Sequence, residues 1–242
     1  MSRKGFELLI FWVGIAGACL IQSCASSNLS PETPESMFKA AEYYENEHRF
    51  EEALRRYTEL RKKFPYSQWA TEAELKIADV YFKQESYPEA YLAYQNFREL
   101  HPLHPKSDYV LYCIGLSLYH QLPETYDRDL SLAPQTLEIF TEFIQNYPNS
   151  SYLNDVKMKY QEVDQKIIDK IRYIADFYFK RQNYVSALER YQSLLLKAAK
   201  DEDRKWALIR ARMSAKKVGN IELEKKFEKK IKVEYPDVIL ED

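Results

Sequence analysis

One spacing recurs along this chain and limits what it can fold into: an aromatic residue is followed, eight positions later, by proline. The three copies are Tyr57 to Pro65, Tyr94 to Pro102 and Phe140 to Pro148. Before the first two aromatic residues, alanine stands four positions upstream and tyrosine thirteen positions upstream. Small residues let two helices approach closely, and aromatic residues fill the space between successive pairs. The recurrence therefore predicts a stack of helix pairs.

This pattern is the signature of tetratricopeptide (TPR) repeats, which build binding surfaces rather than catalytic pockets. We expect an all-α fold, a superhelical solenoid of about five TPR helix pairs in one domain over residues 35–242. The repeats are expected at residues 35–65, 72–102, 107–148, 168–198 and 204–236. Only 5 Gly stand against 20 Tyr and 12 Phe, which suits helices packed through aromatic side chains and argues against a disordered chain.

The third repeat is interrupted. Residues 122–133 are too polar and turn-prone to continue a helix, and a loop of this length in a compact array is usually functional or disordered. Its Asp127-Arg128-Asp129 stretch is interpreted as a local salt-bridged loop or a partner contact rather than a charge relay. After the loop, residues 152–180 read as one long helical stretch whose tail opens the fourth repeat.

Charge is unevenly distributed, although the net formal charge is only −2. Residues 30–60 carry eight Glu against four Lys and Arg, whereas residues 204–232 carry eleven Lys and Arg against three Glu. The basic end is either a solvated face or a contact surface for an acidic partner or anionic lipid heads. No stretch resembles a nucleic-acid module, and a pI near 6.2 argues against nucleic acid as a partner.

The amino-terminal residues have the pattern of an export signal. Arg3 and Lys4 precede an apolar run over residues 8–21, too short for a comfortable membrane span but suited to a signal peptide over residues 1–23. The run ends in Ile21-Gln22-Ser23-Cys24, which resembles a bacterial lipobox, although Gln22 is not the commonest residue at its position. The rival cysteine, Cys19, lies inside the apolar run. Cys24 is therefore the predicted lipidation site, diacylated on its thiol.

A lipidated Cys24 leaves the mature chain with one further cysteine, Cys113, so no intramolecular disulfide is expected. Cys113 lies in an apolar helical stretch and reads as a small buried residue. Residues 24–34 read as a flexible tether between lipid and fold. Ala25 follows the lipidated cysteine, and its resemblance to lipoprotein sorting signals favours the outer membrane.

No catalytic motif stands out. The one metal-like spacing, His101 to His104, has no carboxylate or thiol close in sequence, and the chain lacks a phosphate-binding loop, a nucleophile elbow and a Cys–His pair. We expect no enzyme activity, no cofactor and no metal.

TPR arrays bind along the groove lined by the first helix of each pair. A register set by Ala41, Ala78, Gly115 and Ala175 places residues along this inner face, among them Asp169, Arg172, Asp176 and Phe179 in the fourth repeat. Many are aromatic, which favours an apolar groove for a peptide. The alternative is that these rings pack under neighbouring helices. The predicted substrate-peptide groove comprises Phe38, Leu75, Asp79, Phe82 and Tyr112.

With lipobox, repeats and loop in place, the chain resembles the BamD family, TPR lipoproteins of the outer-membrane β-barrel assembly machinery. The resemblance extends from Cys24 to the carboxyl end and is carried mostly by turns and loops. The stretches that carry it are Lys63 to Ser67, Leu100 to Pro105, Asp108 to Tyr112, Asp127 to Asp129 and Tyr147 to Tyr152. It departs from the family pattern at residues 196–200, where an aromatic–proline ending is expected.

The resemblance implies a non-enzymatic scaffold on the periplasmic face of the outer membrane of a Gram-negative bacterium. Its first repeats would receive the carboxyl-terminal signals of unfolded barrel proteins, which typically end in an aromatic residue. Its last repeats would dock a periplasmic POTRA domain of the insertase BamA, with Arg190 aligned to a docking arginine. Accessory lipoproteins of the same complex are further expected partners. The alternative is another periplasmic TPR lipoprotein, an adaptor in cell-envelope maintenance.

Overall fold

The computed structural model describes residues 32–240, so the expected signal peptide and Cys24 lie outside the described residues. Within this range the chain forms ten helices and no strand, and each helix packs on the next. The expected all-α array of five TPR helix pairs is confirmed for this part of the chain. The helices are α2 (Pro34–Asn46), α3 (Phe50–Lys63), α4 (Gln68–Lys83), α5 (Tyr87–Leu100), α6 (Ser107–Tyr119), α7 (Ala133–Asn146), α8 (Leu153–Lys180), α9 (Tyr184–Lys197), α10 (Asp201–Val218) and α11 (Ile221–Glu234).

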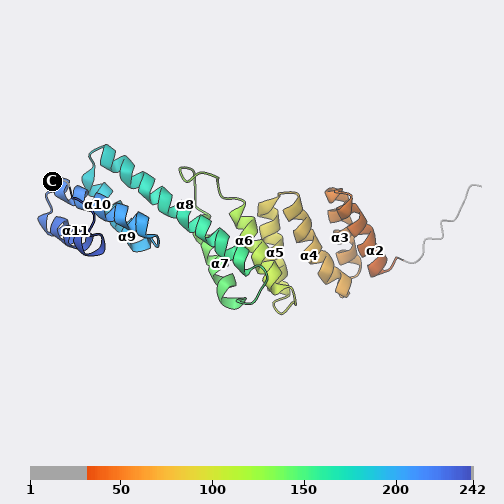
Figure 1. Ribbon diagram of the computed structural model, residues 1–242. Coiled ribbons are helices and arrows are strands. Elements are labelled where there is room, and N and C mark those ends of the chain that lie inside the picture. Colours follow the sequence, from red (N-terminus) through yellow and green to blue (C-terminus); the bar gives the residue numbers. More distant parts are fainter. Residues whose placement is uncertain (1–31, 241–242) are drawn as a thin grey trace, which may run out of the picture.

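Figure 1 shows an elongated molecule with a stacked array at one end and a smaller group at the other. Helices α2–α7 lie side by side in the array, and α9–α11 gather around the far half of α8. Helix α8 is 28 residues long and joins the two parts, as the sequence predicted for this stretch. Its first half packs with the third repeat and its second half forms the first helix of the fourth.

The turn inside a repeat has the same backbone form in four of the five pairs. Two positions before the second helix begins, the chain takes a positive φ at His48, Glu85, Gln182 and Gly219. Only the last is glycine, the residue that adopts this conformation without steric cost. In the third repeat the loop of residues 120–132 replaces the turn.

Small residues facing large ones set the distance between helices. Tyr57, Tyr94 and Tyr191, at equivalent places on the second helices, are fully buried. At the crossing of α6 and α7, a Cβ added to Gly115 would lie 2.4 Å from the Phe140 ring, so only glycine admits this approach. The small–large pattern that predicted the fold is therefore the pattern that packs it.

The buried side chains fall into separate clusters that divide along α8. Val156 and Val163 join the core of the second and third repeats, whereas Ala175 joins the core under α9, α10 and α11. Cys113 is buried in the core of the second and third repeats, as predicted, and burial raises the pKa of its thiol to about 12. None of the helices between residues 32 and 240 is long and apolar enough to cross a membrane.

Candidate partner-binding surfaces

Two of the predicted groove residues belong to the core. Phe38 is 7% exposed and packs against the rings of Tyr57 and Trp69, at centroid distances of 5.4 and 5.0 Å. Leu75 is 2% exposed in the core of the second and third repeats. The prediction that these side chains line an open groove is wrong, because close helix contacts let neighbouring helices cover them. Of the two interpretations, packing holds for both.

Asp79 is committed to hydrogen bonds within the array. Its Oδ1 accepts from the hydroxyl groups of Tyr94 and Tyr109 at 2.7 and 2.8 Å, which links α4 to α5 and α6. Burial raises the pKa of the Asp79 carboxyl, although the two tyrosine hydrogen bonds oppose the shift. Asp79 thus braces the array from inside rather than presenting a free charge.

The same brace recurs in other repeats. Tyr191 donates to Asp176 at 3.0 Å, and Tyr57 donates to Glu45 at 2.7 Å. Glu45 also pairs with Lys83 at 2.5 Å and Lys76 at 3.4 Å, so one buried carboxylate ties α2 to α4. Burial favours a raised pKa for Glu45, but the hydrogen bonds from Lys83 and Tyr57 and the charge of Lys76 outweigh it, and its pKa is lowered.

Phe82 is the predicted groove residue that keeps an accessible aromatic environment. It is half-buried and lies in a group with Tyr87 and His120, here called the Phe82 cluster. The Phe82 centroid is 5.4 Å from that of Tyr87 and 5.8 Å from that of His120, and the latter two rings stack at 4.7 Å. Burial and the charge of Lys159 lower the pKa of His120, so the ring is neutral at neutral pH.

Tyr112 is half-buried on α6 and faces the start of α8. Its hydroxyl donates to Asp155 at 2.8 Å, and its ring stacks on Tyr152 at 4.5 Å. The five predicted groove residues therefore do not form one open groove. They are divided between core, internal braces and the Phe82 cluster.

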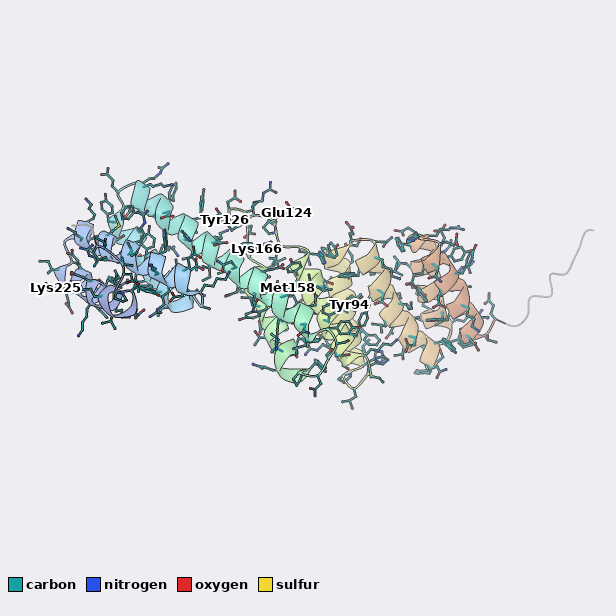
Figure 2. All side chains as sticks on the ribbon, in the orientation of Figure 1. Tyr94, Glu124, Tyr126, Met158, Lys166 and Lys225 are labelled. Carbon is teal, nitrogen blue, oxygen red and sulfur yellow. The ribbon has the colours of Figure 1, made fainter. Side chains whose placement is uncertain are left out.

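The loop of residues 120–132 is fastened to α8. The Lys166 ammonium donates to the Pro123 carbonyl at 2.8 Å, and Lys170 donates to the carbonyl of Arg128. Leu130 is buried in the core of the second and third repeats. Figure 2 shows Glu124 and Tyr126 of the loop beside α8, near Lys166. These contacts hold the loop against α8.

Of the two interpretations of Asp127-Arg128-Asp129, the structure does not show the salt-bridged loop, and the partner contact stays a prediction. The Arg128 side chain forms no ion pair within the described range of 32–240. Asp129 instead accepts hydrogen bonds from the backbone and hydroxyl of Ser131, at 3.0 and 2.9 Å. Local backbone capping satisfies this carboxylate, and neighbouring charges in sequence do not guarantee a bridge.

Between this loop and α8 lies a hollow of about 600 Å³, here called the α8 hollow. Three partly exposed aromatic rings face it: Tyr126 is 40% exposed, Tyr173 50% and Phe177 44%. The inner-face register predicted three of its residues, Asp169, Arg172 and Asp176. It did not predict Tyr173 and Phe177. The sequence pattern that could have indicated them is an aromatic pair spaced i, i+4 outside the apolar face of the helix. The hollow is lined by Tyr126, Asp169, Arg172, Tyr173, Asp176, Phe177 and Lys180.

Several charges of the α8 hollow are already engaged. Arg172 lies 3.5 Å from Asp203 and 4.1 Å from the Trp206 centroid, which ties α8 to α10. Asp176 accepts the Tyr191 hydrogen bond, while Lys180 is exposed. Clustered, partly exposed aromatic rings beside charged groups are typical of protein-binding surfaces.

Arg190, the residue expected to dock the insertase, is exposed on α9 and forms no ion pair with the described residues. The two histidines with metal-like spacing contact different neighbours. His101 Nε2 lies 2.7 Å from Glu74 Oε2, and the His104 ring packs edge-on against Phe97. Within residues 32–240 no group of three metal-ligating side chains comes together.

Comparison with known proteins gives a consistent match. A family profile described as "YfiO: Outer membrane lipoprotein" matches residues 31–231. Outer membrane protein assembly factor BamD of Neisseria gonorrhoeae is 28% identical over 201 residues, which cover 78% of this chain and 75% of that protein. The protein of the same name from Vibrio cholerae is 25% identical over 192 residues, covering 75% and 80%.

Among solved structures, the TPR2AB-domain:pHSP90 complex of yeast Sti1 aligns with a TM-score of 0.46 and 11% identity. The alignment covers 85% of this chain and 78% of that one. PilF of Pseudomonas aeruginosa aligns with a TM-score of 0.42 and 16% identity, covering 86% and 79%.

Proposed function

Because this chain belongs to the YfiO family of outer membrane lipoproteins, we propose that it is a non-enzymatic factor in the assembly of outer-membrane β-barrel proteins. The observation that carries this function is the family match over residues 31–231, with relatives named outer membrane protein assembly factor BamD. A stacked helical array supports a positioning role: it holds partners close together, which raises their effective concentration.

The protein acts at the periplasmic face of the outer membrane, held there by lipid on Cys24. The lipobox-like sequence before Cys24 supports this anchor. Palmitate labelling of the protein in cells tests it: wild type incorporates label, and Cys24→Ala does not. Labelling that persists in Cys24→Ala would contradict the anchor without touching the assembly function.

The carboxyl-terminal repeats dock a POTRA domain of the insertase BamA. The exposed Arg190 and the aromatic rings of the α8 hollow support this assignment, because desolvated arginine and aromatic side chains dominate the energetics of protein interfaces. Native co-purification in mild detergent tests it. The insertase is expected to copurify with wild type and to be reduced with Arg190→Glu. An insertase absent from the wild-type complex would overturn the proposed function.

The Phe82 cluster is the contact surface for the aromatic carboxyl-terminal residue of an unfolded barrel protein. The half-buried rings of Phe82 and Tyr87 and the exposed ring of His120 support it, since they leave ring surface for an added aromatic group. Leu75 is buried in the core against which Phe82 packs. A fluorescent peptide with a carboxyl-terminal Phe is expected to bind about tenfold more weakly to Phe82→Ala, a loss of about 1.4 kcal/mol. Unchanged affinity would remove the Phe82 cluster from the site.

A further inference from the structure

The last helix of the structure presents one face to its neighbours and a row of lysines away from them. Phe227 and Ile231 of α11 are buried in the core with α10. Away from this core, Lys225, Lys226, Lys229 and Lys230 are all exposed, here called the α11 lysine face. Residues three and four apart lie on one side of a helix, so these four side chains form a continuous patch.

Among residues 32–240, no ion pair holds the ammonium groups of this patch, although the charge of Lys230 contributes, after the hydrogen bond from Arg204, to lowering the pKa of Glu234. Three of the four carboxylates of α11 are engaged by other cations: Glu224 with Arg212 at 3.9 Å, Glu228 with Lys232 at 2.6 Å, and Glu234 with Arg204 at 3.0 Å. The fourth, Glu222, stands in the first turn of the helix. None of the four lysines forms an ion pair in the described part of the chain.

Aliphatic side chains accompany the lysines. Val233 is 74% exposed and lines a shallow hollow of about 280 Å³ with Lys226, Lys229, Lys230 and Glu234, whose carboxylate pairs with Arg204. Ile221, at the start of the helix, is 64% exposed. Lysines with interspersed aliphatic residues are the composition of helices that lie on a membrane surface, where the apolar groups reach the boundary of headgroups and acyl chains.

The choice of lysine distinguishes a lipid surface from a protein partner. Protein interfaces are enriched in arginine and aromatic residues and depleted in lysine, whereas this face has four lysines and no aromatic side chain. A mobile ammonium on a long stem suits the laterally mobile phosphates of lipids better than a fixed carboxylate pattern does. We propose that the α11 lysine face binds the headgroups of anionic phospholipids at a membrane surface.

The position of α11 gives this contact a consequence. Figure 1 shows α11 at the opposite end of the molecule from the first repeat, and Figure 2 shows Lys225 at that outer end. Given the lipid anchor proposed above, a second contact at the far end holds the array along the membrane instead of projecting from it. The affinity of the lysines for anionic lipid does not depend on that anchor.

The test uses the full, processed chain reconstituted in phospholipid vesicles, with a fluorescent label at Val233→Cys. Cys113 is 3% exposed with a thiol pKa of about 12, so it does not compete for the label. Nitroxide-bearing lipids are expected to quench the label in vesicles with roughly a third of phosphatidylglycerol and not in pure phosphatidylcholine. About 1 M salt, which shortens the screening length to about 3 Å, is expected to abolish quenching.

Replacing Lys225, Lys226, Lys229 and Lys230 by Gln is expected to lower the ratio of quenched to unquenched label roughly fivefold per lysine. A matched variant replaces four other exposed lysines by Gln, at Lys62, Lys157, Lys197 and Lys200, and so has the same net charge. It is expected to leave quenching unchanged. Circular dichroism confirms that both variants fold.

Quenching that is absent from anionic vesicles, equal in neutral ones, or lost alike in both variants would overturn the proposal. Loss of a copurifying protein from the lysine variant, with no quenching in wild type, would assign the face to an acidic protein and overturn it too. Flotation of the protein with vesicles is scored separately. A chain that fails to float with neutral vesicles contradicts the lipid anchor, while the quenching result still decides the lysine face.

Discussion

The array of α2–α7 and the end formed by α8–α11 are built from the same helix pair and share its tyrosine–carboxylate hydrogen bond, but they differ in the side chains that stay open to a partner. In the array, Asp79 and Glu45 are held by tyrosine hydroxyls and Phe38 is covered. At the far end, Tyr173 and Phe177 stay half-exposed and the α11 lysine face forms no ion pair with residues 32–240.

This difference teaches where a repeat protein can bind without losing its shape. Groups that fix the spacing of neighbouring helices cannot contact a partner without weakening the stack. Groups left over at the long helix α8 and at the terminal helix can, because terminal repeats lack a further neighbour to cover them. Substitutions of the buried groups of the array should therefore act on stability, and substitutions of the exposed groups at the far end on binding.

The largest contrast is expected between two phenylalanines. Phe143 is fully buried on α7, so Phe143→Ala should cost about 3–5 kcal/mol through lost burial and a cavity. Phe177 is 44% exposed on α8, and Phe177→Ala should cost less than about 1 kcal/mol. Urea denaturation followed by circular dichroism measures both. Equal costs would remove the distinction between the two regions.

The buried carboxylate of Glu45 should give the next largest effect. Glu45→Gln keeps the Tyr57 hydrogen bond but removes the charge that pairs with Lys83 and Lys76, at a cost of about 1–3 kcal/mol at neutral pH. The pKa of Glu45 is lowered in the folded state, so its stabilisation is complete above the unfolded value of 4.5 and is lost as pH falls through the folded value. The difference between wild type and Glu45→Gln should therefore shrink only below pH 4.5.

Asp79 provides the control, because its pKa is shifted the other way. Burial raises it above 3.8, so ionisation of Asp79 costs native stability, and this cost disappears as pH falls through the folded pKa. Relative to Asp79→Asn, wild type should gain stability on acidification in that window. The stability difference between wild type and Glu45→Gln and that between wild type and Asp79→Asn should therefore change with pH in opposite directions. If both change in the same direction, the two carboxylates do not act as internal braces in the manner described.

Each of two substitutions, one in each region, should weaken one binding interaction about tenfold, or by about 1.4 kcal/mol, and leave the other unchanged. Phe177→Ala is expected to weaken recovery of the insertase and leave the affinity for a carboxyl-terminal Phe peptide unchanged. Phe82→Ala is expected to do the reverse. Pull-down and fluorescence anisotropy measure the two interactions on the same protein samples. If one substitution weakens both interactions, the two surfaces are not independent.

The smallest expected effect is in thiol protection. With burial raising its pKa to about 12, Cys113 should not react with a maleimide at pH 8 in the native protein. Phe177→Ala should leave this protection intact, whereas Phe143→Ala should speed labelling by increasing local opening of the same core. Mass spectrometry of timed samples measures the rate. Fast labelling of wild type would show that this core opens readily.

Much of the fold could be read from local pattern. The alanine–aromatic–proline spacing predicted the helix pairs, and the uninterrupted run after Ser150 predicted the long α8. These predictions hold because helix formation and pairing depend on residues close in sequence. The same logic placed Cys113 in the core.

The sequence by itself determined the repeat fold, the order of its helices, the uneven charge and the family resemblance. Only the tertiary structure decided that Phe38 is covered, that Asp79 is bound by two tyrosines, and that the rings of the α8 hollow are open. Helical periodicity says which residues share a face. Whether that face meets another helix or solvent depends on inter-helix distances set by residues tens of positions away, so exposure, and with it the capacity to bind, emerges only in the folded chain.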